Sequence, residues 1–217
     1  MTTVLQPVEA TTQAEQKVIL YNISWETYER LLAEHPESSS TRFAYDRGTL
    51  EIMILSVRHE RVKHTLSTLV EVSAEQLQLD NTGLGSTTFR RVDLERGFEP
   101  DACFYFAHAE AMRQKDEIDF MTDPGPELVI EIDISHPSLD KFPIFAAFGV
   151  AEVWRWDGAR RGIHRLAAGA YQAVSESALL PGVTAELINK LLAASQTLKR
   201  ADWLRLVRES AAAGGDQ

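Results

Sequence analysis

The sequence has very little cysteine and no long hydrophobic run. Its 217 residues include one cysteine, Cys103, so no internal disulfide can form. No apolar stretch approaches the ~20 residues that a membrane-spanning helix needs. Residues 1–16 lack a basic region followed by an apolar one, so they do not resemble a secretory signal. We therefore expect a cytoplasmic protein with no membrane partner, in a reducing compartment.

Several catalytic motifs are also missing. The sequence holds no glycine-rich phosphate loop, no cysteine and histidine spacing typical of zinc, and no Gly-x-Ser-x-Gly elbow. These absences disfavour nucleotide hydrolysis through a P-loop, zinc chemistry and serine hydrolysis.

A surplus of positive charge is missing as well. The chain has 22 Lys and Arg against 32 Asp and Glu, a net charge of −10. This balance argues against a simple basic nucleic-acid coat and against a polybasic membrane patch. Residues 93–140 hold thirteen of the acids and three of the bases, which accounts for the whole net charge. The remainder is neutral and has bases available for a nucleic-acid backbone, while the acids of 116–123 are expected in a solvated loop.

The pattern of apolar residues alternates between helix and strand. Ser24 is placed to cap a short helix, and residues 42–54 predict a hairpin around a turn at 46–48. Apolar residues recur at helical spacing over 58–79. The run 127–134 is β-branched and apolar on both faces, which predicts a central buried strand. Further strands are expected at 86–92, 100–106, 152–156, 163–166 and 171–174, and further helices at 138–148 and 184–208.

These elements predict a single α/β (α+β) domain in which helices flank a mixed sheet. We place the domain at residues 17–208, after a flexible arm at 1–16 and before a frayed tail at 209–217. The aromatic residues on predicted strands and helices, such as Trp154, are expected in the core. Arg155 alternates with the tryptophans and therefore faces the opposite side, toward solvent or a cleft.

Carboxylates interrupt the most apolar strands. Glu131 and Asp133 lie two positions apart and so share a face, and Asp101 begins another apolar strand. Burying an unpaired charge is costly, so three converging carboxylates predict a cation between them. Oxygen ligands favour Mg²⁺ or Mn²⁺ over zinc. The alternative, which we favour for Asp133 alone and for Glu127, is a carboxylate at a strand end that is solvated or hydrogen-bonded to loop amides.

These acids lie in blocks that resemble known nuclease motifs. The segment 98–105, FEPDACFY, resembles the Pro-Asp strand of the PD-(D/E)XK nuclease superfamily, and 123–135, DPGPELVIEIDIS, resembles its second acidic strand. Residues 141–157 are similar to the next helix and strand, and 56–59, SVRH, to a Ser-x-x-His before a long helix. Over residues 24–192 the chain resembles the Uma two family of restriction-endonuclease-like proteins. The resemblance implies a restriction-endonuclease-like mixed sheet with an N-terminal hairpin.

The sequence departs from the superfamily at the lysine of its Glu-x-Lys pattern. Asp133 stands at the lysine's position, two residues after Glu131. In the Uma two family a lysine from the following helix takes that place, and Lys141 matches it. The alternative for Lys141 is a solvated surface lysine beside Asp140.

The resemblance implies a metal-dependent endonuclease that hydrolyses DNA phosphodiester bonds with Mg²⁺ or Mn²⁺. Asp101 and Glu131 would hold the metal, and Asp133 would complete its shell. Lys141 would orient the attacking water or neutralise charge on the phosphorus. A homodimer is expected from analogy with the fold.

The start of the helix at 58–79 carries weaker signals. His59 would add an outer ligand or a proton shuttle, as Glu60 would, but an ordinary capping or surface histidine is an equal alternative. Bases near this helix and at the end of a strand are able to contact DNA phosphates, although a solvated face is the simpler interpretation of each. They are Arg58, Arg61, Lys63, Arg90 and Arg91.

Two other functions stay open. The replaced lysine leaves room for a catalytically silent nuclease-fold module that binds nucleic acid or a protein partner. A metal-dependent hydrolase of some other phosphoester is the third hypothesis.

Overall fold

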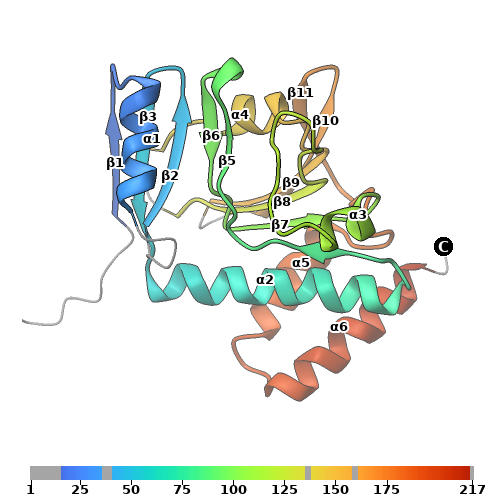
Figure 1. The fold of residues 1–217 in the computed structure, drawn as a ribbon. Coiled ribbons are helices and arrows are strands. Elements are labelled where there is room, and N and C mark those ends of the chain that lie inside the picture. Colours follow the sequence, from blue (N-terminus) through green and yellow to red (C-terminus); the bar gives the residue numbers. More distant parts are fainter. Residues whose placement is uncertain (1–15, 36–40, 135–137, 158–160, 216–217) are drawn as a thin grey trace, which may run out of the picture.

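The strands of the protein form two sheets that stand side by side (Figure 1). The computed structural model describes residues 16–35, 41–134, 138–157 and 161–215. The five-stranded sheet has the order β1-β3-β2-β6-β5, and the six-stranded sheet has the order β11-β10-β9-β8-β7-β4. The first sheet consists of β1 (Gln16–Leu20), β2 (Thr41–Asp46), β3 (Thr49–Ile54), β5 (Phe89–Arg91) and β6 (Arg96–Phe98). The second consists of β4 (Thr82–Gly83), β7 (Ala102–Tyr105), β8 (Leu128–Ile132), β9 (Glu152–Trp156), β10 (Arg161–Ala167) and β11 (Ala170–Val174).

Helices flank these sheets and confirm the predicted α+β class. The long helix α2 runs beneath the strands, with α5 and α6 beside it (Figure 1). None of the helices in the described ranges is long and apolar enough to cross a membrane. The helices are α1 (Trp25–Glu34), α2 (Val57–Gln76), α3 (Ala109–Arg113), α4 (Phe142–Ala147), α5 (Ala185–Ala194) and α6 (Arg200–Gly215).

The first sheet is built around the predicted hairpin. β2 and β3 pair antiparallel through a two-residue turn, Arg47-Gly48, and both turn residues have positive φ angles of 43° and 95°. This is the conformation that two-residue hairpins need, and glycine adopts it without strain. Helix α1 begins after Ser24, whose Oγ accepts the Thr27 N–H at 3.2 Å, as predicted.

The predicted central strand is β8. It pairs antiparallel with β7 and parallel with β9, and each of its five residues is buried. Its two faces contribute to different cores. Ile130 packs with Leu66 of α2 and Trp203 of α6, whereas Val129 packs with Phe98 of the first sheet and Phe145 of α4. Continuous apolar character is expected of a strand that is covered on both faces.

One predicted boundary differs from the structure at the N-terminal side, and several short elements were not predicted. Gln16–Leu20 forms strand β1 on the edge of the first sheet, paired antiparallel with β3, although Gln16 was expected to end a flexible arm. Residues 1–15 of that arm lie outside the described residues. The short strands β4 and β6 were also not predicted, because their pairing with distant strands rather than local periodicity defines them. Helix α3, with five residues, is too short to show a helical pattern.

The C-terminal helix predicted at 184–208 is two helices. After α5, the chain turns at 195–199 and α6 folds back, and the Trp203 Nε1–H donates to the Leu191 carbonyl at 2.7 Å. α6 is helical to Gly215, beyond the point at which a frayed tail was expected. Near its end the backbones of Gly182 and Gly214 approach so closely that a Cβ on Gly182 would lie 2.4 Å from the Gly214 Cα.

Candidate active site

The register of the central strands brings three polar residues together. Ala102 of β7 lies opposite Ile130 of β8, so that Asp101 follows beside Glu131. Glu131 is in turn paired with Arg155 of β9. Neighbouring residues in a sheet project from the same face, and this face is the one that α4 and the first sheet cover.

Asp101 is buried, and each of its two oxygens accepts one hydrogen bond, which leaves acceptor capacity on both. It is 1% exposed, its Oδ2 accepts the Ile132 N–H at 2.7 Å, and its Oδ1 accepts the His59 Nε2–H at 2.7 Å. His59 stands in the first turn of α2, where Ser56 Oγ accepts the His59 backbone N–H at 3.1 Å. The histidine is therefore not on the surface, and its ring supports Asp101.

Lys141 lies between two carboxylates. Its Nζ is 2.6 Å from Glu131 Oε1 and 2.9 Å from Glu51 Oε1. Lys141 precedes α4, and the peptide N–H of Leu139 in the same segment donates to Glu51 Oε2 at 2.8 Å. The side chains of all three charged residues are nearly inaccessible. Lys141 is thus not the solvated surface lysine of the alternative interpretation.

Negatively charged side chains outnumber positively charged ones around Lys141. Burial raises the pKa of Glu131 to about 7; the charge of Lys141 opposes this shift, and those of Asp101 and Glu51 add to it. Burial also works against the Lys141 ammonium, but Glu131, Glu51 and Asp101 outweigh it and raise the pKa of Lys141. One lysine therefore faces three carboxylates in a region of low dielectric.

Asp133 has different partners from those of Glu131. Lys17 of β1 donates to its Oδ1, while Arg155 Nη2 and Ser138 Oγ donate to its Oδ2 at 2.6 and 2.9 Å. Burial alone would raise the pKa of Asp133, but Lys17 foremost, then Arg155 and Ser138, lower it to about 2. Both oxygens of Asp133 are thus occupied, as in the hydrogen-bonded alternative, and its role as a metal ligand stays a prediction.

A shallow hollow opens beside Glu131 and Lys141. Its lining consists of Glu131, Asp133, Leu139, Asp140, Lys141, Phe142, Phe145 and Arg155.

The donor atoms at this site suit a hard divalent cation. Asp101, Glu131 and Glu51 offer carboxylate oxygens, and a divalent cation would offset the negative charge that Lys141 leaves uncompensated. Glu51 Oε1 is buried, and its ion-pair partner is Lys141 Nζ at 2.9 Å. Within these ranges no three Asp, Glu, His or Cys side chains lie close enough together to hold a metal. The carboxylate oxygens are thus of the chemical type that a divalent cation binds, but the side chains would have to move closer together to hold one.

Glu51 and Lys17 are the two site residues that sequence reasoning missed. Glu51 lies in the apolar segment Leu50–Ile54. A carboxylate inside an apolar strand is the same signal that pointed to Glu131, so it was available in the sequence. Lys17 carried no comparable signal, because β1 is too short to show a pattern.

Several predicted outer residues lie away from the site. Glu60 is exposed and pairs with Lys63, its Oε2 lying 2.8 Å from Nζ, so it does not accompany His59. Arg90 pairs with Glu29 and Arg91 with Asp93, while Arg58 lies 5.4 Å from the centre of the Trp156 ring. These contacts agree with the simpler interpretation, in which each of these arginines lies on a solvated surface. Glu127 accepts the Phe106 N–H at 2.9 Å and lies 2.5 Å from His108 Nδ1, as its alternative predicted.

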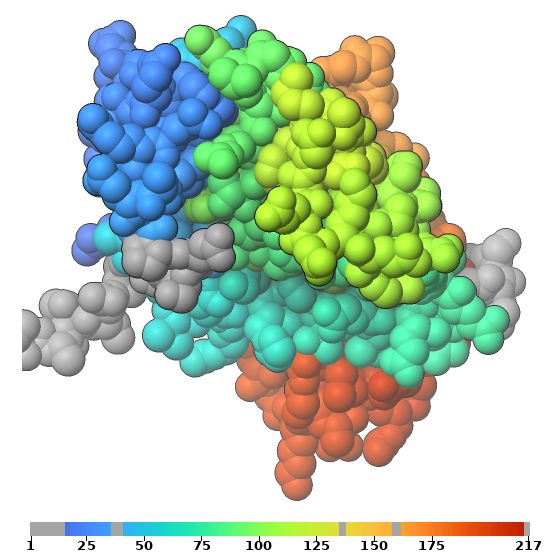
Figure 2. All heavy atoms as spheres, in the orientation of Figure 1, coloured from blue at the N-terminus to red at the C-terminus, as the bar shows by residue number. Residues whose placement is uncertain are grey.

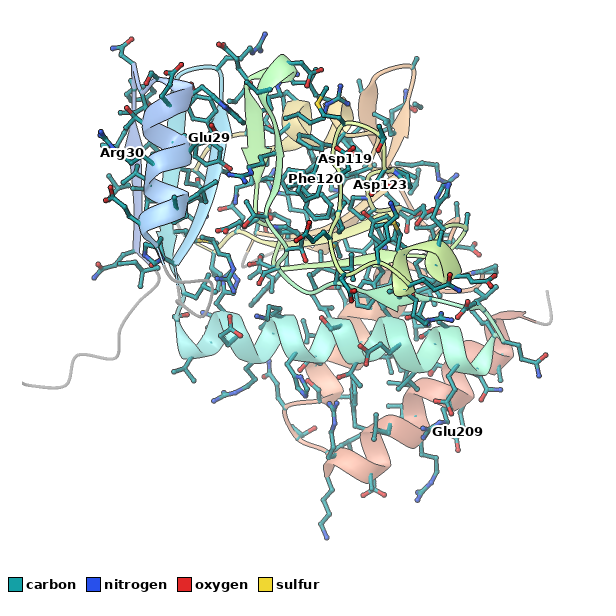
Figure 3. The ribbon with its side chains drawn as sticks, in the orientation of Figure 1. Glu29, Arg30, Asp119, Phe120, Asp123 and Glu209 are labelled. Carbon is teal, nitrogen blue, oxygen red and sulfur yellow. The ribbon has the colours of Figure 1, made fainter. Side chains whose placement is uncertain are left out.

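The acidic loop is on the surface, as expected. Figure 2 shows this loop packed beside β5 and β6, and Figure 3 shows Asp119, Phe120 and Asp123 together on it. Its acids are nevertheless ordered by local contacts. Lys115 Nζ lies 2.5 and 2.7 Å from the two oxygens of Asp123, and Phe120 packs against Phe89 with ring centres 5.2 Å apart. The loop has no contact with Glu131 or Lys141 among these interactions.

The comparison with known families decides which fold this is. The model of Uma2, described as "Putative restriction endonuclease", matches residues 25–194. The chain belongs to the Uma2 family. The family confirms the resemblance noted from the sequence, and the mixed sheet with its flanking helices has the restriction-endonuclease-like fold. A comparison with curated proteins found no match. Membership of the Uma2 family indicates nuclease-like chemistry with DNA as the substrate.

Proposed function

We propose that this Uma2 protein is an endonuclease that hydrolyses DNA phosphodiester bonds with Mg²⁺ or Mn²⁺. The observation that carries the proposal is the buried cluster of Asp101, Glu131 and Lys141, of which Glu131 and Lys141 line one hollow. Three different segments of the chain supply these residues, and a fold has no structural need to bury three charges at one point.

Asp101 and Glu131 would hold the metal, with Glu51 as a third oxygen donor. When bound, the ion would polarise the scissile phosphate and lower the pKa of a water molecule. Lys141, whose Nζ contacts Glu131 and Glu51, would stabilise negative charge on a phosphate oxygen. His59 fixes the orientation of Asp101 through Nε2. Asp133 is committed to Lys17 and Arg155, and we assign it a supporting role.

The test is cleavage of plasmid DNA with Mg²⁺ or Mn²⁺, and with a chelator. The wild type is expected to cut only with metal, while Asp101→Asn and Lys141→Ala are expected to lose at least ~100-fold of that activity. Asp119→Asn, an exposed acid on the surface loop, is the matched control and should cut like the wild type. Equal cutting by wild type and Asp101→Asn would reveal a contaminating nuclease and remove the support for catalysis.

The second candidate function is a catalytically silent binding module, and two observations favour it. Lys141 is held by Glu131 and Glu51, and no ready three-donor metal cluster exists in the described ranges. Such a module would bind DNA with the same affinity in the presence and absence of metal, and would not cut it. Metal-dependent cleavage of a non-nucleic phosphoester in place of DNA would instead support the third hypothesis.

We also propose, by analogy with the fold, that the protein acts as a homodimer whose two active sites would each cut one strand of a duplex. Sedimentation equilibrium measures this directly. A mass of twice 24.3 kDa is expected, and a monomer at all concentrations would contradict it. The cytoplasmic location stays a prediction from the sequence.

A further inference from the structure

Arg155 shares the face of the sheet that carries the candidate active site. It lies directly opposite Glu131 in the parallel pairing of β8 and β9. Its neighbours Trp154 and Trp156 are buried on the other face, with α2 and α5. Arg155 also lines the same hollow as Glu131 and Lys141. The arginine is therefore within the site.

The guanidinium of Arg155 is held in place but not buried. Its Nη2 donates to Asp133 Oδ2 at 2.6 Å, and its Cζ lies 5.5 Å from the centre of the Phe142 ring. Phe142 is itself fixed by stacking on Tyr171, with ring centres 4.9 Å apart. The side chain of Arg155 keeps 31% of its surface exposed. A guanidinium fixed in this way loses little further entropy when it binds an anion.

Arg155 is the more accessible of the two cations that contact Asp133. Lys17 also pairs with that carboxylate, and its side chain is 2% exposed, whereas that of Arg155 is 31% exposed. Lys141, by contrast, is buried and occupied by two carboxylates. Arg155 is therefore the lining cation of the hollow that is accessible to a ligand.

We infer that Arg155 forms a phosphate subsite, which binds the DNA backbone phosphate next to the scissile one. The inference rests on the proposed function, because it names how the substrate of the same site is held. A planar guanidinium offers paired N–H donors that match two phosphate oxygens. Because Glu131 and Asp140 line the hollow and repel a polyanion, the site needs an accessible cation at its rim before metal and Lys141 can act.

The experiment measures binding of a labelled DNA duplex over a series of salt concentrations, with Ca²⁺ replacing Mg²⁺. Arg155→Gln is expected to weaken binding about tenfold and to lower the slope of log K against log salt by about 0.9, the value of one lost phosphate contact. Arg155→Lys should keep the slope and lose several-fold in affinity, because it keeps the charge without the paired donors.

Two controls separate the phosphate contact from structural support. Arg205→Gln removes an exposed arginine of α6, whose side chain is 68% exposed, and should change neither quantity. Ser138→Ala removes a hydrogen bond to Asp133 but keeps the cation, so it should also bind like the wild type. Thermal unfolding of each variant shows whether it is folded. Should Arg155→Gln not fold, Arg155→Lys decides the matter by its affinity.

The outcomes are distinct. An unchanged affinity and slope in Arg155→Gln, with a wild type that binds DNA, would overturn the subsite and leave the proposed nuclease standing. An equal loss in Ser138→Ala would show that Arg155 acts only through Asp133, which also overturns it. A wild type that binds no DNA would overturn both proposals.

Discussion

Lys141 sets the charge balance of the site at the scale of a single residue. Its ammonium contacts Glu131 and Glu51 from a segment that precedes α4. Without it, those carboxylates would be buried next to Asp101 and would lose the cation that they contact. The same side chain thus has a structural and a proposed catalytic role, and the two roles are separable by experiment.

Lys141→Met is expected to destabilise the protein by about 3–5 kcal/mol, because it leaves two buried carboxylates without their cation. Urea unfolding measures this change. Lys63→Met is the matched control, since it removes a lysine from the exposed pair with Glu60 and should cost under about 1 kcal/mol. Equal, small losses in both variants would show that Lys141 is not buried as described. The double variant Lys141→Met with Glu51→Gln should recover part of the loss.

Asp133 predicts how stability depends on pH. Its pKa is lowered from 3.8 to about 2 by Lys17, Arg155 and Ser138. A carboxyl with a lowered pKa stabilises the folded state above its unfolded pKa, and this contribution is lost as pH falls from about 4 to 2. The contribution amounts to about 2 kcal/mol. The free energy of unfolding of Asp133→Asn should therefore fall less steeply over that range than that of the wild type, and parallel curves would contradict it.

At the scale of elements, β8 and its neighbours do most of the positioning. Asp101, Glu131 and Arg155 occupy adjacent positions on β7, β8 and β9 because the register fixes them. The first sheet then supplies Glu51 from β3 and Lys17 from β1 across the gap between the sheets. The site is thus assembled between two sheets, and a shift of either one would separate its charges.

The pair of C-terminal helices supports this arrangement from the other face of β8. Trp203 of α6 is buried, and its indole N–H donates to the Leu191 carbonyl in α5. Trp203→Ala is expected to cost about 3–5 kcal/mol in the free energy of unfolding. The control Leu198→Ala changes an apolar side chain that is 42% exposed and should cost about 0.5 kcal/mol or less. A small effect of Trp203→Ala would mean that α6 does not pack as described.

At the scale of the whole molecule, the negative net charge divides into two kinds. Surface acids such as Asp119 and Asp123 order a loop, together with Lys115 (Figure 3). The acids Asp101 and Glu131 lie in the interior instead, where one lysine does not balance them. The acidic composition is therefore compatible with a DNA substrate, because the interior part of the charge is the part that a metal would offset.

Metal binding should be visible in the stability of the whole protein. A metal at 100 times its Kd stabilises the folded state by about 2.7 kcal/mol, which corresponds to a rise in Tm of roughly 5–10 °C. Mn²⁺ should raise the Tm of the wild type and of the control Asp119→Asn, but not that of Asp101→Asn. Calorimetry measures all three. An equal rise in Asp101→Asn would place the metal elsewhere, and no rise in the wild type would remove the metal from the proposal.

The sequence by itself determined the fold class, the central strand and three of the interior charges. A continuous apolar strand can only be buried, so the carboxylates within or beside such strands were identifiable as Asp101, Glu131 and Asp133. Lys141 and His59 followed from the family motif. The structure placed Lys141 with Glu131 and His59 with Asp101.

Only the tertiary structure decided which charges become partners. Asp133 was grouped with Glu131 because the two share a face, yet it pairs with Lys17 and Arg155, which approach from other strands. Glu51 reaches Lys141 from the separate first sheet. The reason is physical: local periodicity reports which face a side chain occupies, whereas the packing of two sheets and the pairing register determine what it meets there.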